Sequence, residues 1–132
     1  MNDKESHIQL WMQKAEHDSV TAKITYLHLP QYYDTIAFHC QQAVEKYMKA
    51  MLVFCGIPFI RTHNLVYLST LLADKIEITE ELQQNAILLN SFSVEIRYPN
   101  QLIPLTKTEL EVAIKTAEDF KSVVKKVVEQ PL

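Results

Sequence analysis

Hydrophobic residues recur at three- and four-residue spacing along most of this chain, which is the period of an amphipathic α-helix. The first such run extends from Ser6 to His28 and ends at Leu29-Pro30-Gln31, because proline cannot continue the helical hydrogen-bond ladder. The second run extends from Tyr32 to Cys55, and Gly56 suits the left-handed residue just beyond a helix end. Its expected core stripe consists of Ile36, Cys40, Ala43, Tyr47, Met51 and Phe54.

Start signals predict three further helices. Asn64 is a candidate N-cap for a short leucine-rich helix, and a fourth helix is expected after Thr79. Thr106 and Glu109 form a capping box that opens the last helix. Residues 94–104 are expected to form a loop, because prolines interrupt helix there. The pattern therefore predicts an all-α protein, an up-and-down bundle of about five helices that forms a single domain over the 132 residues.

The second expected helix carries a polar arc opposite its core stripe. This arc holds His39, Gln41, Gln42, Glu45, Lys46 and Lys49. Lys46 and Lys49 lie one turn apart, and their ammonium groups could meet the phosphate oxygens of a nucleotide. The alternative is a solvated face on which Glu45 pairs with Lys49 at i,i+4. Three apolar residues share the arc and suggest a partner surface, namely Phe38, Leu52 and Val53.

Composition narrows the classes of function. One glycine and five prolines are too few turn-formers for a large sheet, and the net charge of -3 argues against broad, non-specific nucleic-acid binding. No apolar run approaches the roughly 18 residues of a membrane span, and the charged start shows no secretory signal. Cys40 and Cys55 would lie about 22 Å apart on one helix, too far to bridge. We therefore expect free, buried thiols and a cytoplasmic location.

Sites for metals, cofactors and common nucleophiles are not predicted. His7, His17 and His28 are spaced too widely for a helical metal site, and one glycine cannot make a phosphate-binding loop. No Ser-His-Asp arrangement with a sharp nucleophile turn is visible. We therefore assign no catalytic residue, no metal ligand and no cofactor from these patterns.

Three segments together resemble the HEPN family of small helical domains tied to nucleotide and RNA chemistry. They are residues 38–50 with Gln41-Gln42-Ala43-Val44-Glu45-Lys46 at the centre, Arg61-Thr62-His63-Asn64-Leu65, and Glu95-Ile96-Arg97-Tyr98-Pro99-Asn100. The resemblance covers roughly Ile8 to Val128, with Asn100 where the family often has an acid. Ribonuclease members of the superfamily carry an Arg with a His five to seven positions downstream. Neither arginine of this chain has such a His, which argues against that nuclease chemistry.

The resemblance and the chemistry of the side chains indicate where a nucleotide could bind. Gln42 can read a base edge or bond a neighbouring helix, and Arg61 with His63 can hold an anion or order their loop. Tyr98 offers a ring for stacking, while Arg97 either binds ligand or pairs with an acid such as Glu45 or Glu95 and staples the loop. The candidate nucleotide-binding residues are Gln42, Lys46, Lys49, Arg61, His63, Arg97 and Tyr98.

The resemblance implies a binding module for a nucleotide or RNA, without catalysis of its own. It also implies a homodimer and a minimal nucleotidyltransferase as partner, in a two-component or toxin–antitoxin pair. One alternative is a ribonuclease that uses His63 or Arg97 in a non-standard arrangement. Another is a structural interaction protein, in which Phe38, Leu52 and Val53 form an obligate interface.

Overall fold

Five α-helices make up the part of the chain that the computed structural model describes, residues 2–91 and 105–129. They are α1 (Asp3–His28), α2 (Tyr33–Cys55), α3 (Leu65–Leu72), α4 (Glu80–Asn90) and α5 (Lys107–Glu129), and no strand occurs among these residues. The predicted all-α class is confirmed. The loop expected over residues 94–104 lies outside the described residues.

Local hydrogen bonds explain where the helices begin and end. The side chain of Asn2 accepts a bond from the Glu5 amide, so α1 begins at Asp3 rather than at the predicted Ser6. Gly56 adopts φ 71°, the left-handed conformation that ends α2. Thr106 and Glu109 exchange two bonds of 3.0 Å at the start of α5, which confirms the predicted capping box.

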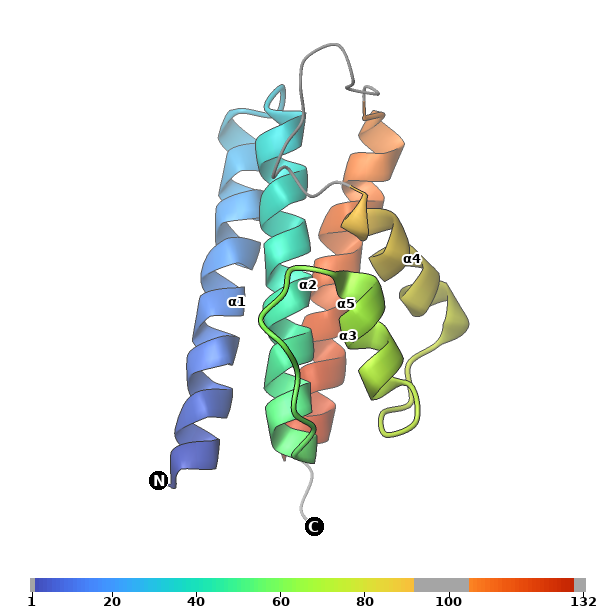
Figure 1. Ribbon diagram of the computed structural model, residues 1–132. Helices are drawn as coiled ribbons and strands as arrows, with labels where there is room; N and C mark the ends of the chain where they lie inside the picture. The colour runs from blue at the N-terminus through green and yellow to red at the C-terminus, as the bar shows by residue number, and fades with distance from the viewer. Residues whose placement is uncertain (1, 92–104, 130–132) are drawn as a thin grey trace.

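The three long helices lie side by side, and the two short ones cover one flank (Figure 1). Helices α1 and α2 are joined by a tight turn and pack against each other along their length, while α5 packs on α2 from another side. Figure 1 shows the segment 56–64, in green, running back along α2 before α3 begins. This return path places the segment over a face of α2 that would otherwise meet solvent.

Helix α2 is the centre of the core. Nine of the ten residues from Ala43 to Leu52 are buried, which leaves only Lys46 partly exposed. The large side chains of Tyr47 on α2 and Phe120 on α5 are each 1% exposed. A helix enclosed on this many sides has no solvated polar face along that stretch, so its polar side chains must find partners inside the protein.

The prediction of an exposed polar arc on α2 is therefore wrong for several residues. Gln41, Glu45 and Lys49 are 0%, 2% and 5% exposed, because α1 and the segment 56–64 cover them. Leu52, expected at a partner surface, is 0% exposed and belongs to the core of this chain. Phe38 and Val53 are half-buried.

Both cysteines are free, as expected, but they differ in burial. Cys40 is fully buried, whereas Cys55 is only partly buried, so the prediction of two buried thiols holds for Cys40 alone.

Candidate functional site

The carboxylate of Glu45 is the centre of a buried polar network on α2. Its Oε2 accepts a bond from Lys49 Nζ at 3.1 Å, and its Oε1 accepts from His63 Nδ1 at 2.8 Å. Lys49 Nζ also donates to the backbone oxygen of Thr62 at 2.8 Å. The predicted i,i+4 pair of Glu45 and Lys49 is thus present, but it is buried rather than solvated. Two cationic or polar donors compensate the cost of burying this carboxylate.

Aromatic rings enclose the ammonium group of Lys49. Its Nζ lies 5.1 Å from the centroid of the Trp11 ring and 6.0 Å from that of Phe59. Such positions favour a cation electrostatically and exclude water from it. Lys49 therefore joins α1, α2 and the segment 56–64, and the expectation that it projects to solvent beside Lys46 is wrong.

Side chains of α2 and α4 fix the backbone around His63. Gln41 Nε2 donates to the carbonyl oxygen of His63 at 3.0 Å, alongside the bond from Lys49 to Thr62. Asn64 caps α3 by accepting from the amides at positions 66 and 67, as predicted. The amide of Leu65 donates to Asn90 Oδ1 at 2.8 Å. These contacts agree with the alternative in which His63 helps to order its loop, although 52% of its side chain is exposed.

A second polar cluster links α1 to α2. Asp18, only 12% exposed, accepts from His39 Nδ1 at 2.8 Å and from the ammonium group of Lys46. Lys46 is therefore paired with an acid, and only 20% of its side chain is exposed to solvent. Asp18 was not among the predicted site residues. Its presence neutralises one of the two cations that the sequence suggested for phosphate binding.

Gln42 and Arg61 complete the predicted residues that the structure describes. Gln42 is half-buried and donates to Gln41 Oε1 at 2.7 Å, so it bonds its neighbour rather than the backbone of another helix. Arg61 is exposed and forms no ion pair with any acid in residues 2–91 and 105–129. Arg97 and Tyr98 lie outside the described residues. Lys46 and Lys49 on this face of α2 have acidic partners, whereas Arg61 has none among the described residues.

The thiols and the buried phenol near this core are not activated groups. Burial raises the pKa of Cys40 to about 12, and burial likewise raises the pKa of Cys55. Burial also raises the pKa of Tyr47, whose hydroxyl donates to Glu16 at 3.3 Å. All three groups therefore stay protonated near neutral pH and are poor nucleophiles.

Metal ligands and membrane spans are not found in the described part of the chain. No three His, Cys, Asp or Glu side chains among those residues lie close enough together to hold a metal ion. None of the described helices is both long and apolar enough to cross a bilayer.

Comparisons with known proteins give the family of this chain. The sequence model of the HEPN domain matches residues 8–127. A protein of Methanocaldococcus jannaschii named "Putative toxin MJ1304" is 33% identical over 134 residues, which cover 90% of this chain and 86% of that protein.

Two crystal structures share the fold. TT1696 from Thermus thermophilus aligns with a TM-score of 0.77 at 22% identity, covering 91% of this chain and 97% of that one. ST0689, described as an archaeal HEPN homologue, aligns with a TM-score of 0.68 at 23% identity, covering 89% and 94%. Since the family model spans nearly all of the sequence and the helices superpose on these structures, the chain belongs to the HEPN family.

Proposed function

We propose that this HEPN protein is a non-catalytic binding module for a nucleotide or an RNA end, and that the ligand's phosphate is held at the loop that carries Arg61 and His63. One observation carries the proposal. Arg61 is an exposed guanidinium without an acidic partner in the described residues, on a loop whose following residues are fixed by the buried Glu45 network. A guanidinium on an ordered loop is well suited to bind a phosphate group, because it can donate two parallel N–H···O bonds to two phosphate oxygens.

The charges around the loop indicate a small ligand and modest affinity. Lys49 is paired with Glu45, and Lys46 is paired with Asp18, so neither adds a free positive charge. The chain as a whole has a net charge of -3. A surface of this kind supports one or two phosphate contacts rather than the many contacts of a general nucleic-acid binder. Half-buried Gln42 on α2, and Arg97 with Tyr98, remain predicted contributors to recognition of the base.

The proposed biological setting is a pair with a minimal nucleotidyltransferase. The name of the M. jannaschii relative, "Putative toxin MJ1304", supports a place in a toxin–antitoxin pair. We also propose a homodimer, for which half-buried Phe38 and Val53 remain candidate contacts. Leu52 does not contribute to that surface, since it is buried in the core.

The test of the phosphate site is a calorimetric titration with a purine nucleoside monophosphate. We expect a dissociation constant between micromolar and millimolar, roughly -4 to -8 kcal/mol. Arg61→Gln should weaken binding about tenfold, the value of one charge-assisted bond. Lys125→Gln is the matched control, because it removes one exposed positive charge from α5. An equal loss in both variants would show only a general charge effect and would contradict a site at Arg61.

The second candidate function is a ribonuclease, and one observation favours it. His63 Nδ1 lies 2.8 Å from a carboxylate oxygen of buried Glu45, and a carboxylate that orients an imidazole in this way is a recurrent part of general-base catalysis. The superfamily spacing of Arg and His is nevertheless missing, and Arg61 lies before His63 by two residues only.

We expect that the purified protein does not cleave RNA. The assay is incubation of labelled single-stranded RNA with the protein in the presence of a chelator, followed by gel electrophoresis. His63→Ala is the informative variant, since a contaminating nuclease would be unaffected by it. Cleavage that copurifies with the parent protein and disappears in His63→Ala would replace the binding proposal by the ribonuclease proposal.

A further inference from the structure

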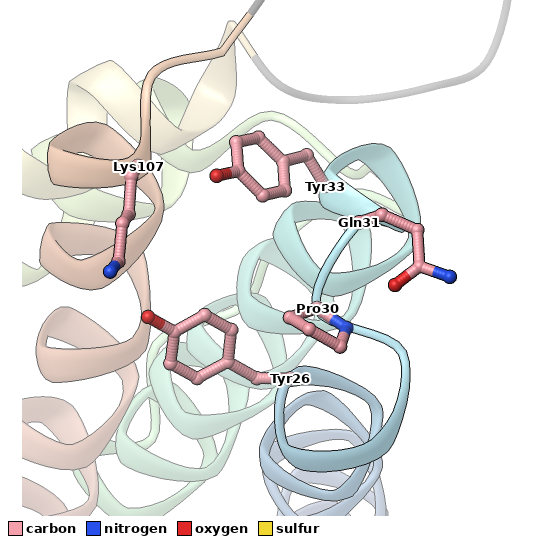
Figure 2. A pocket seen from close by; sticks show the side chains of 5 residues that line it. All are labelled: Tyr26, Pro30, Gln31, Tyr33 and Lys107. Atoms are coloured by element: carbon pink, nitrogen blue, oxygen red, sulfur yellow. The ribbon is translucent and has the colours of Figure 1, made fainter.

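A hollow of about 520 Å³ lies where the turn between α1 and α2 faces the start of α5 (Figure 2). Its walls are Tyr26, Pro30, Gln31, Tyr33 and Lys107. The hollow is wide open to solvent, and its volume is comparable to that of small-ligand pockets. None of these residues belongs to the segment 56–64 or to the Glu45 network, so the hollow is separate from the site proposed above.

Three polar groups of the hollow have no partner within the described part of the protein. Figure 2 shows the phenol hydroxyls of Tyr26 and Tyr33 turned toward the start of α5, where the side chain of Lys107 extends beside them. Among the described residues, none of the three forms a hydrogen bond or ion pair. Tyr26 and Tyr33 are half-buried, so their rings are held by packing while their hydroxyls face the opening.

Rigid elements hold these groups in place. Tyr26 lies in the last turns of α1, and Tyr33 is the first residue of α2. The turn between them is closed by backbone bonds from Leu29 to Thr25 and from Tyr32 to Leu29. Lys107 is the first residue of α5 and lies within the capping box, between Thr106 and Glu109. The two tyrosine side chains, half-buried on helix ends beside this turn, therefore require little ordering when a ligand binds.

The charge of the hollow favours an anion. Lys107 can only donate hydrogen bonds, and a phenol hydroxyl donates to an anionic oxygen readily. No Asp or Glu of the described residues lines the hollow. The nearest acids along the chain are Asp34, next to Tyr33, and Glu109, two residues after Lys107; neither lines the hollow, and the Glu109 carboxylate accepts a bond from the Thr106 amide. Three donors around one opening match the several acceptor oxygens of a phosphate group better than the two of a carboxylate.

We propose that this hollow binds a terminal phosphate group, with Lys107 and the hydroxyls of Tyr26 and Tyr33 as donors to its oxygens. Pro30 and the two tyrosine rings provide an apolar wall beside the phosphate. The group reaches the site either as free inorganic phosphate or as the 5′-phosphate of a nucleotide. A nucleobase can stack on an exposed aromatic face, so the nucleotide gains contacts that the free ion lacks.

The experiment is a titration of the full-length protein, with ¹³C-labelled tyrosine rings, followed by NMR. The probes are inorganic phosphate, adenosine 5′-monophosphate and adenosine. We expect both phosphate compounds to shift the ring signals of Tyr26 and Tyr33, and adenosine to leave them unchanged. Tighter binding of the monophosphate identifies the nucleotide as the source, and equal binding identifies the free ion.

Conservative variants test the three donors without disturbing the fold. Lys107→Gln should weaken binding at these signals about tenfold, and Tyr26→Phe or Tyr33→Phe should each weaken it several-fold. Tyr32→Phe and Lys125→Gln are matched controls for a hydroxyl and a charge outside the lining, and they should bind as the parent does. Thermal melting checks that each variant stays folded.

The same titration of the Arg61→Gln variant distinguishes this site from the one proposed at Arg61. In Arg61→Gln, the shifts of Tyr26 and Tyr33 should persist with an unchanged dissociation constant. Loss of these shifts in Arg61→Gln would mean that the ligand binds at Arg61 alone, and would overturn the proposal. Absence of any shift up to about 10 mM phosphate compound, or an equal response to adenosine, would overturn it as well.

Discussion

Replacing Glu45 by Ala is expected to lower the free energy of unfolding by about 3–5 kcal/mol, the largest effect among the polar residues. The carboxylate is 2% exposed and is bonded to both Lys49 and His63. Without it, the ammonium group of Lys49 stays buried with one carbonyl and two rings as its remaining partners. Urea unfolding followed by circular dichroism measures the loss.

Two further variants make this result specific to the buried charge. Glu111→Ala removes an exposed acid from α5 and should change stability by less than about 0.5 kcal/mol. The double variant Glu45→Leu with Lys49→Met removes both charges, and replacement of a whole buried pair is often close to neutral. The double variant should therefore be more stable than Glu45→Ala. A loss in the double variant as large as in the single one would contradict the account of an unpaired lysine.

Replacing Leu52 by Ala is expected to cost about 2–5 kcal/mol of stability, because it leaves a cavity in the core. Leu52 is 0% exposed within a single chain, so the loss should appear at every protein concentration. A loss that grows on dilution would instead place Leu52 at an interface between chains. Unfolding curves at several concentrations distinguish these cases.

Leu27 is the matched control for this substitution. It lies on α1 with 74% of its surface exposed, so Leu27→Ala removes the same atoms without making a cavity. We expect its unfolding curve to coincide with that of the parent protein. Sedimentation of both leucine variants shows whether either one alters the oligomeric state.

The helices could be predicted from sequence because their signals are local. Asn64, Gly56 and the pair Thr106 and Glu109 act within a few residues of the backbone groups they satisfy. Each of these signals predicted a helix end that the structure contains. Family resemblance added the order of the motifs, and the match to residues 8–127 confirms the family.

The surroundings of α2 could not be predicted in the same way. A helical wheel assumes one buried face, whereas α2 is covered by α1, α5 and the segment 56–64. Glu45 and Lys49 are polar in sequence but can be buried in the fold, since Lys49 donates to Glu45 and also to the loop carbonyl of Thr62. The hydrophobic periodicity of a sequence shows which side of a helix is polar. It does not show whether a loop distant in sequence covers that side.

The contact of Asp18 with α2 could have been predicted from the sequence. Helices α1 and α2 are antiparallel neighbours across the turn at Pro30, so residues at similar distances from that turn face each other. Asp18 lies 12 residues before Pro30 and Lys46 lies 16 residues after it, so the two residues lie at comparable distances from the turn along the two helices. Pairing of opposite charges across the expected hairpin would have indicated the Asp18 cluster. The hollow beside Lys107 offered no such signal, because α5 is distant in sequence from the turn.

The Glu45 network also restricts how this protein can change over evolutionary time. A single substitution at position 45 or 49 leaves its former partner buried and unpaired, whereas a joint replacement by apolar residues does not. Positions 45, 49 and 63 should therefore covary among related sequences, changing together or not at all. Arg61 lies on the same loop as His63 but has no such partner in the described residues, so we expect position 61 to vary independently of positions 45 and 49.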